Sequence, residues 1–452
     1  MTQFDRMVWI ILALLALGLV GVLAAGTLIG IPAPHAGWDE EDGVGGRGPL
    51  RLVFSQPMDH DSVEQRIHVE PEIQGVFQWQ ANTLLFLPQQ PLESGQAYQL
   101  DLDSGAESED GRQIRTAGSW TFQARDPWVV YLTPSRGITQ IVKENPATLE
   151  SVSLTQAEDF IYDFGIAVDG ERIAYSLKND QNGIDLWVID RDGGDNQTLL
   201  NCAMDWCTNP AWSLDGQLVA YSRRSAPIDV GGPPGVPRVW LLDLTSHDTY
   251  PVFASQEVTG FDPSWSPDGQ RLAFFDGVGG GIRVLNLANN QDFLLTSNMG
   301  SIGSWTPDGQ RMLYITTEMS PSGFPYVNVL SADLVNQAVA PILGEDLDQV
   351  EYSTPSVSPD GEWIAVGLRY VNAGASKQLW IMHLDGSQPQ AVTQQENYTH
   401  AGYRWSANGE MLVYQRYELG SSNTKPEVVV WDRRSDESVL ISEDGTLPAW
   451  LP

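Results

Sequence analysis

The sequence predicts an all-β chain whose larger part is a β-propeller, and a repeated motif is the main reason. A seven-residue motif that ends in Asp-Gly or Asn-Gly recurs with its glycines 40 to 53 residues apart. The copies lie at 164–170, 210–216, 263–269, 303–309, 355–361 and 403–409. A run rich in β-branched and aromatic residues follows each copy, and further short apolar runs complete the unit. Self-similarity at this period, with four short strands in each unit, is typical of propeller blades.

Each element of the repeat has local chemistry that suits its place. The sequence Ser-Pro-Asp-Gly, at 266–269 and 358–361, favours a type I turn because proline presets φ at the second position. Second strands are predicted at 172–176, 218–222, 271–275, 311–315, 363–367 and 411–415, and third strands at 186–190, 239–244, 282–287, 326–330, 379–384 and 428–432. A short fourth strand follows, as at 292–297. This order resembles the TolB-type (WD-like) β-propeller repeat, which also occurs in prolyl-oligopeptidase-like enzymes. The resemblance covers 164–452 and implies a fold, not an activity.

The two ends of the propeller region predict how the ring closes. Residues 128–160 have strand-like runs but no Asp-Gly turn, whereas Pro448-Ala449-Trp450 repeats the motif of 210–212. We expect 446–451 to form the first strand of a seventh blade, with 128–133, 138–142 and 149–154 as its other strands. Such closure removes free sheet edges. A six-bladed ring with 128–160 as a linker is the alternative.

The N-terminal segment predicts a membrane anchor. Residues 7–31 carry no charge, and 25 helical residues span about 37 Å, enough to cross a hydrocarbon core of about 30 Å. Arg6 lies before the segment, so the positive-inside rule leaves residues 1–6 as a cytoplasmic stub and exports the rest. We expect a single-pass protein of a bacterial cell membrane. Cleavage after Ala24 or Ala25, which would give a secreted form, is the alternative.

Between this anchor and the propeller we expect a linker and a second domain. Residues 32–48 are rich in Pro, Gly and acidic residues, which is typical of a flexible linker. Residues 49–125 alternate apolar and polar side chains in short runs, which predicts a small β-sandwich. The sequence at 50–63 and 79–105 resembles the bacterial Ig-like domain of surface-layer and other exported proteins. That resemblance implies a spacer or interaction module, followed by the propeller at 128–452.

Charge and cysteine content limit the partners and the chemistry. The formal net charge of −33 argues against a nucleic-acid partner, whose phosphates require clustered Lys and Arg. Cys202 and Cys207 are the only cysteines, and two thiols this close in an exported chain predict a local disulfide. A C-x-x-C redox site has a different spacing, and two ligands do not make a zinc site.

The repeated polar and aromatic residues invite a functional interpretation, but their positions favour a structural one. We expect the turn residues Asp169, Asp215, Asp268, Asp308, Asp360 and Asn408 to cap their own turns. We expect Trp212, Trp265, Trp305, Trp405 and Trp450 to pack between blades. A row of carboxylate sites and a ring of glycan-stacking aromatics are the respective alternatives.

No familiar catalytic motif is present. The chain lacks G-x-S-x-G, H-E-x-x-H and Walker A sequences, and its six histidines (35, 60, 68, 247, 383 and 400) are scattered. Residues 190–196 resemble the start of a calcium loop but lack the glutamate at its twelfth position. The acidic stretch with Glu345, Asp346, Asp348 and Glu351 is expected to be a solvated loop. We therefore predict no catalytic, cofactor-binding or metal-binding residues.

The longer loops predict a recognition surface. Connections between second and third strands are extended at Ser225–Arg238, Thr317–Pro325, Tyr370–Lys377 and Glu418–Lys425, and in a propeller these connections share one face. We predict a non-enzymatic binding or scaffold protein of the cell envelope that recognises a protein or peptide there. One alternative is a polysaccharide- or peptidoglycan-binding module. Another is a propeller enzyme such as a sugar lyase, which would need a metal or a His, Lys or Arg base in the central channel.

Overall fold

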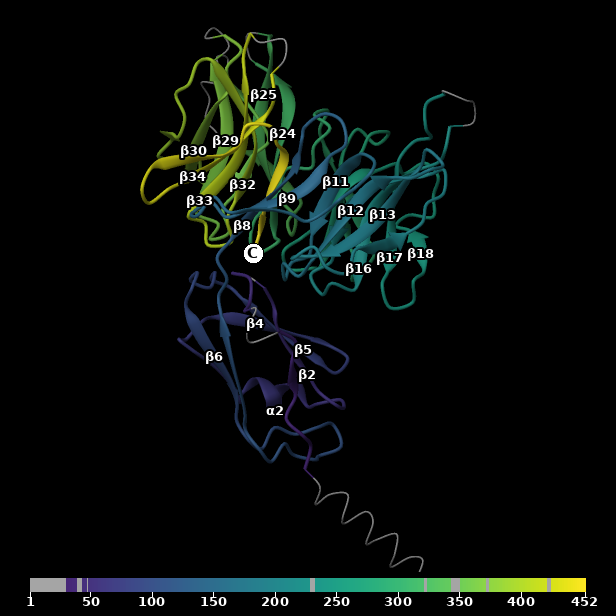
Figure 1. Cartoon of the computed structure of the whole chain (residues 1–452), viewed down its shortest axis with the longest axis vertical. Coiled ribbons are helices and arrows are strands. Elements are labelled where there is room, and N and C mark those ends of the chain that lie inside the picture. The colour runs from purple at the N-terminus through teal and green to yellow at the C-terminus, as the bar shows by residue number, and fades with distance from the viewer. Residues whose placement is uncertain are drawn as a thin grey trace, which may run out of the picture. The chain divides into compact units, whose positions relative to one another are not determined.

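The computed structural model describes residues 30–38, 43–46, 48–227, 232–320, 323–342, 350–370, 374–420 and 424–452. These residues form two compact units. The first comprises the described residues up to Val44 together with Pro49–Gln90 and Ser94–Arg125, and the second comprises Gly45–Gly48, Pro91–Glu93 and Asp126–Pro452. Strands make up nearly all of the regular structure in both units (Figure 1).

The first unit consists of two antiparallel sheets. Their strand orders are β1-β2-β5-β4 and β3-β6-β7. The strands are β1 (His35–Ala36), β2 (Leu50–Val53), β3 (Ile67–Glu70), β4 (Gly75–Gln80), β5 (Thr83–Pro88), β6 (Ala97–Leu102) and β7 (Gly118–Gln123). Leu50 and Leu52 of β2 are buried, as expected when alternate side chains of a strand face the core. The short helix α2 (His60–Glu64) begins at Asp59, whose carboxylate accepts a hydrogen bond from the amide of Ser62 at 2.9 Å.

Part of the segment that we expected to be a flexible linker belongs to this unit. Strand β1 pairs with β2, and Val44 forms a bridge with Ala124. Ile31, at the end of the expected membrane span, is buried and forms a bridge with Ile114. Backbone pairing and apolar burial therefore hold these residues of the segment 32–48 against the sheets, which composition alone does not indicate.

Most of the expected membrane anchor precedes the first described residue. The cytoplasmic stub 1–6 and residues 7–29 of the expected span lie outside the described residues. Within the described part of the chain, no helix has both the length and the apolar character needed to cross a membrane.

The second unit is a propeller of seven blades, each with its strands paired antiparallel. Blades 1 to 3 are β11 (Ile161–Ile166), β12 (Arg172–Lys178), β13 (Ile184–Asp190) and β14 (Gln197–Leu200); β15 (Trp206–Trp212), β16 (Leu218–Arg224), β17 (Arg238–Asp243) and β18 (Thr249–Pro251); and β19 (Phe261–Trp265), β20 (Arg271–Asp276), β21 (Gly281–Asn286) and β22 (Asp292–Thr296). Blades 4 and 5 are β23 (Ser304–Trp305), β24 (Arg311–Met319), β25 (Pro325–Asp333) and β26 (Ala338–Pro341); and β27 (Val350–Tyr352), β28 (Ser356–Val357), β29 (Trp363–Tyr370), β30 (Gln378–His383) and β31 (Gln390–Ala391). Blade 6 is β32 (Tyr398–Trp405), β33 (Met411–Glu418), β34 (Glu427–Asp432) and β35 (Glu437–Ser442), and blade 7 is β36 (Thr446–Leu451), β8 (Trp128–Thr133), β9 (Gln140–Glu144) and β10 (Ser151–Ser153).

Blade 7 joins the two ends of the propeller region. Strand β36 pairs with β8, so that Ala449 lies opposite Val130 and Trp450 lies opposite Val129. The strand order β10-β9-β8-β36 is the one expected from the Pro-Ala-Trp motif, and residues 128–160 are therefore not a linker. The six-bladed alternative is excluded, because this sheet is a complete blade.

Buried clusters show that the ring is continuous. Each pair of consecutive blades shares one apolar core. Leu451 of blade 7 packs with Ile173 and Ile189 of blade 1, and Tyr131 of blade 7 packs with Val413 of blade 6. Because both sides of blade 7 are covered, the strands from the two ends close the ring.

Blade order defines two faces and a channel. The first strands of neighbouring blades contact one another: β11 contacts β15, β15 contacts β19, and β32 contacts β36. The first strands therefore line the central channel. We call the side that carries the connections between second and third strands, and those from one blade to the next, the loop face. The opposite side, with the Asp-Gly turns and the third-to-fourth-strand turns, is the turn face.

Candidate functional site

The Asp-Gly turns lie on the turn face, one in each of blades 1 to 6, and some turns of consecutive blades approach each other closely, as Asp268 approaches Gly309. The carboxylate of Asp268 accepts hydrogen bonds from Ser266 Oγ at 2.5 Å and from the amide of Gln270 at 3.0 Å. Asp215, Asp308, Asp360 and Asn408 repeat this pattern, while Asp169 accepts from the amide of Glu171. The side-chain acceptors are thus used within their own turns. Across the described residues, no group of three or more His, Cys, Asp or Glu side chains could hold a metal ion.

The repeated tryptophans connect each blade to the one before it. Their indole N–H groups donate from Trp212 to Gly165 O (3.0 Å), Trp265 to Ala211 O (3.0 Å), Trp305 to Ser264 Oγ (3.1 Å), Trp405 to Ser356 O (3.0 Å) and Trp450 to Arg404 O (2.9 Å). The sequence predicted packing at this position, but not a directed hydrogen bond. The available signal was the residue before this position in the preceding blade, which supplies the acceptor and is small in four of the five cases: Gly165, Ala211, Ser264 and Ser356, with Arg404 the exception.

Cys202 and Cys207 form a disulfide on the loop face, in the connection from blade 1 to blade 2. The six-residue loop is tied to both blades. Asn179 Nδ2 donates to Ala203 O at 2.8 Å, and the carboxylate of Asp205 accepts from the amide of Ala226 at 3.0 Å. The disulfide therefore lies beside the start of the longest inter-strand insertion and holds its first residues.

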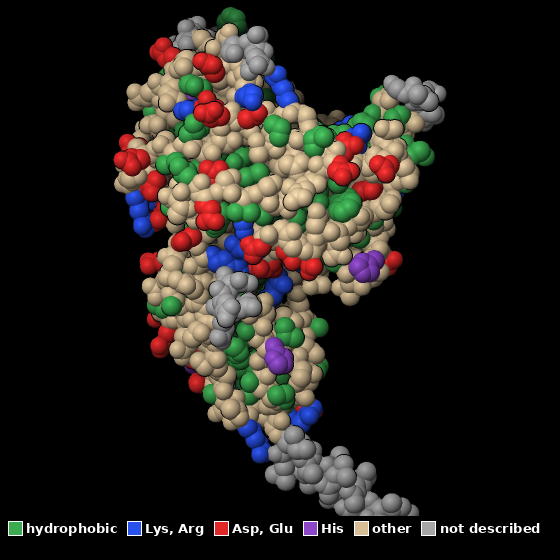
Figure 2. All heavy atoms as spheres, viewed as in Figure 1, with side chains coloured by type: hydrophobic (Ala, Val, Ile, Leu, Met, Phe, Trp, Pro, Cys, Tyr) green, Lys and Arg blue, Asp and Glu red, His purple; other side chains and the backbone are tan. Residues whose placement is uncertain are grey.

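Large exposed apolar side chains gather on the loop face. They are Ile138, Met204, Val236, Val278, Met299, Met319, Phe324 and Tyr370. In the turn-face connections of the described residues, only Leu149 and Val335 are comparable. Acidic side chains are instead distributed over the surface seen in Figure 2, without forming one patch. The two faces thus differ in apolar character, which fits a recognition role for the loop face.

The hairpin of blade 4 carries the most exposed of these side chains. Strands β24 and β25 have nine residues each, and at their ends Met319 is 65% exposed and Phe324 is 71% exposed. Glu318 stiffens the hairpin, because its carboxylate accepts from Tyr326 Oη at 3.0 Å and from Asn328 Nδ2 at 2.7 Å. An aromatic ring and a flexible thioether on a braced hairpin are suited to packing against a partner.

The central channel contains a polar cluster that sequence analysis did not find. Asp163 accepts from Ser176 Oγ at 2.5 Å and from the amide of Asn209, in the next blade, at 3.0 Å. Burial raises the pKa of Asp163 to about 6, and burial also raises the pKa of Asp262. Asp163 and Asp262 occupy the same position of their repeats, but the other blades have Asn, Ile, Thr, Gly and Leu there, so the repeat did not reveal the cluster.

Arg404, on β32, is the cation of the channel. Arg404 is exposed by its accessible surface, but desolvation by the surrounding strands lowers the pKa of its guanidinium, and the charge of Asp262 opposes that shift. No ion pair of Arg404 is found among the described side chains, and its Nη1 donates to Tyr403 O at 3.1 Å. A guanidinium remains protonated in proteins, so Arg404 suits the binding of an anionic group better than proton abstraction.

The histidines do not assemble into a site. His400 is buried on β32, and burial lowers its pKa to about 4, which leaves the imidazole neutral. Its Nδ1 lies 2.9 Å from Lys377 O and, since a carbonyl only accepts, carries the proton. His383 instead stacks on Trp363, with ring centroids 4.3 Å apart.

The two remaining metal candidates of the sequence are the loop 190–196 and the acidic stretch that ends at Glu351. Asp190 and Asp195 repel each other, which adds to the burial that raises the pKa of Asp190, and no ligand group of three is formed there. Glu351 forms an ion pair with Arg369. Glu345, Asp346 and Asp348 lie outside the described residues.

Comparisons with known proteins agree with both predicted resemblances. Residues 166–452 match the TolB beta propeller domain family, and residues 38–124 match the bacterial Ig-like domain family. No curated protein matches the chain. Both family resemblances stated from the sequence are thereby confirmed.

Solved structures show a similar fold at low sequence identity. A structure of prolyl endopeptidases is 13% identical over 84% of this chain and 50% of that chain, with a TM-score of 0.52, so this chain spans half of that protein. TolB from Acinetobacter baumannii is 20% identical over 73% of this chain and 84% of that chain, with a TM-score of 0.42. The β-propeller domain of the Trilobed protease from Pyrococcus furiosus is 13% identical over 78% and 94%, with a TM-score of 0.47. Because the TolB family match covers more than half of the sequence, the chain belongs to the TolB beta propeller domain family.

Proposed function

We propose that this protein is a non-enzymatic binding scaffold that recognises a protein or peptide partner on the loop face of its propeller. The observation that carries the proposal is the concentration of exposed apolar side chains there, with Met319 and Phe324 the most prominent pair on one hairpin. Burying such side chains against a partner releases about 25 cal/mol per Å² of apolar surface. Aromatic residues are frequent binding hot spots.

The proposed location follows from the same domains. A bacterial Ig-like domain beside a TolB-type propeller supports a position outside the cytoplasm. We further propose that the apolar segment 7–31 anchors the chain in a bacterial cell membrane, with the remainder in the envelope. Fractionation tests this: full-length protein should stay with the membrane after a high-salt wash, and recovery in the soluble fraction would contradict the anchor.

The glycan-binding alternative has less support. Glycan recognition would require coplanar, exposed tryptophan or tyrosine rings on one face. The indole N–H groups of the five repeated tryptophans are instead used in hydrogen bonds between blades. Arg404 gives the channel the cation that a propeller enzyme would need, but a group that stays protonated is a poor base.

A pair of matched variants tests recognition on the loop face. Phe324→Asp places a charge where the ring is 71% exposed, and Leu149→Asp does the same at a 52% exposed site on the turn face. Each full-length variant is used to capture partners from envelope extract, beside the wild type. We expect Phe324→Asp to lower recovery of the captured partner at least tenfold, because loss of a hot spot costs about 2 kcal/mol or more. Equal recovery with both variants would contradict the proposal.

A further inference from the structure

An arginine begins the second strand in three blades, and in two of them it binds the next blade. Arg172 Nη2 donates to Gly216 O at 3.2 Å, and Arg271 Nη1 donates to Gly309 O at 3.1 Å. In both cases the acceptor is the backbone carbonyl of the glycine in the neighbouring Asp-Gly turn. The arginine at this position therefore connects adjacent turns across the groove between two blades.

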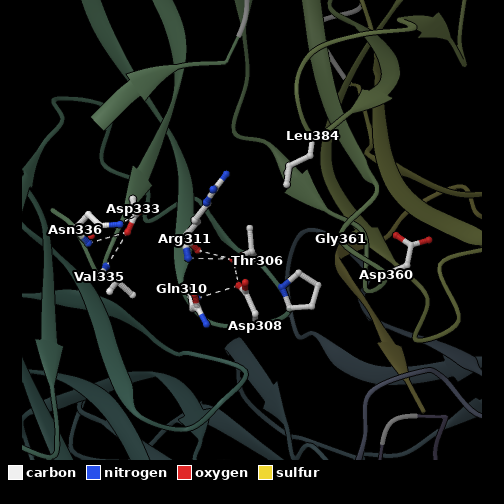
Figure 3. A pocket seen from close by; sticks show the side chains of 11 residues that line it. Thr306, Asp308, Gln310, Arg311, Asp333, Val335, Asn336, Asp360, Gly361 and Leu384 are labelled. Atoms are coloured by element: carbon white, nitrogen blue, oxygen red, sulfur yellow. Dashed lines mark hydrogen bonds between the residues drawn. The ribbon is translucent and has the colours of Figure 1, made fainter. Parts of the chain in front are cut away.

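Arg311 occupies the same position in blade 4 but makes no such bond. Its guanidinium has no hydrogen bond or ion pair in the described residues, and Figure 3 shows no hydrogen bond between it and Gly361, the corresponding turn glycine of blade 5. Arg271 is 9% exposed, whereas Arg311 is exposed. The guanidinium N–H groups that bind the neighbouring turn from Arg172 and Arg271 therefore have no such acceptor at Arg311 in blade 4.

A groove opens where this bond is missing. A hollow of about 400 Å³ lies between blades 4 and 5, and Thr306, Pro307 and Gly361 are among its lining residues (Figure 3). A second hollow, of about 380 Å³, shares Arg311, Asp333 and Leu384 with the first and continues to strand β26. We call the two hollows together the Arg311 groove.

The outer end of the groove is a strand edge. All four residues of β26 are exposed, and β26 is the outermost strand of its sheet. Ala338, Ala340 and Pro341 line the second hollow, opposite Leu384 of blade 5. An outermost strand has backbone N–H and C=O groups without strand partners, which can pair with an added extended segment.

The groove carries more negative than positive charge. Asp308, Asp333, Asp360 and Asp385 line it, against the single guanidinium of Arg311, but the carboxylate of Asp360 lies against Gly409 of blade 6 and points away from the groove in Figure 3. Hydrogen bonds from the amide and side chain of Asn336 and from the amide of Val335 lower the pKa of Asp333. The excess of carboxylates over cations in the groove disfavours an acidic ligand.

We propose that the Arg311 groove binds an extended peptide segment that carries lysine or arginine side chains. In the bound state Arg311 donates to a backbone carbonyl of the peptide, as Arg172 and Arg271 donate to turn glycines. The carboxylates of Asp308, Asp333 and Asp385 receive the basic side chains, and the edge of β26 pairs with the peptide backbone. This site lies on the turn face and does not depend on recognition at the loop face.

Fluorescence anisotropy with labelled peptides tests the proposal on the full-length protein. The probes are ten-residue peptides of alternating lysine and alanine, and of alternating glutamate and alanine. We expect only the lysine peptide to bind, and Asp333→Asn to weaken its binding about threefold, in line with loss of one partly exposed charge pair. The matched control is Asp243→Asn, because Asp243 in blade 2 accepts from the amides of Thr245 and Ser246 just as Asp333 accepts from two amides in its own turn.

The variant Arg311→Met separates this proposal from simple attraction to an acidic surface. If Arg311 donates to the bound peptide, Arg311→Met weakens binding of the lysine peptide about threefold or more. If only net charge matters, removing a cation tightens binding, and that result would overturn the proposal. Equal losses in Asp243→Asn and Asp333→Asn would overturn it as well. An unchanged thermal unfolding curve establishes that each variant is folded.

Discussion

Replacing Leu451 by alanine tests whether the last strand closes the propeller. Leu451 is fully buried, and it packs between the strands of blade 7 and Ile173 and Ile189 of blade 1. Burying a leucine side chain contributes about 1.5–3 kcal/mol, and the cavity left between two sheets adds to the loss. We therefore expect the free energy of unfolding to fall by about 2–5 kcal/mol in Leu451→Ala.

The same strand supplies the control. Leu447 also lies in β36 but is 47% exposed, so Leu447→Ala should change the free energy of unfolding by no more than about 0.5 kcal/mol. Urea unfolding of both variants, followed by tryptophan fluorescence, measures the difference. Because the chain has two units, the transition assigned to the propeller is the one to compare. Similar effects of the two substitutions would refute the closure of the ring by β36.

Three further predictions concern the channel, the blade seams and the disulfide. Burial in the folded state raises the pKa of Asp163 to about 6, so between pH values of about 4 and about 6 the folded chain holds a proton that the unfolded chain releases, and the stability that this group contributes falls as the pH rises. Asp163→Asn should remove this part of the pH dependence of the urea midpoint. An identical pH profile in the variant and the wild type would contradict the prediction. Trp265→Phe removes the indole donor to Ala211 O and should cost about 0.5–1.5 kcal/mol in urea unfolding, whereas no loss would show that water replaces the bond fully. The double variant Cys202→Ser, Cys207→Ser should have a free energy of unfolding lower by about 2 kcal/mol, the value expected for a disulfide that closes a loop of this size. Thiol titration of the unreduced wild type should detect no free thiol, and a titre of two would contradict the disulfide.

The sequence was most informative where structure is local and repeated. The Asp-Gly turns, the strands that follow them and the tryptophan positions recur in several copies, so each copy supports the others. The Pro-Ala-Trp motif at 448–450 even predicted which strand pairs with β8. These features depend on turn chemistry and alternation within a few residues, which composition and spacing reveal directly.

The remaining features depend on contacts between distant parts of the chain. Strand β1 lies in a segment rich in proline and glycine, and only its pairing with β2 makes it a strand. Asp163, Asp262 and Arg404 meet in the channel because the ring brings blades 1, 3 and 6 together, and Arg404 lies at a different position of the repeat from the two aspartates. Arg311 differs from Arg172 and Arg271 only in what it binds, which a repeated letter in the sequence does not show.

Hydrogen–deuterium exchange in the presence of the captured partner shows whether the partner covers the loop face. We expect slower exchange in the blade 4 hairpin around Met319 and Phe324 and in the connection that follows Tyr370. We expect no change in the Asp-Gly turns of the opposite face. Protection confined to those turns, with the blade 4 hairpin unchanged, would contradict recognition on the loop face.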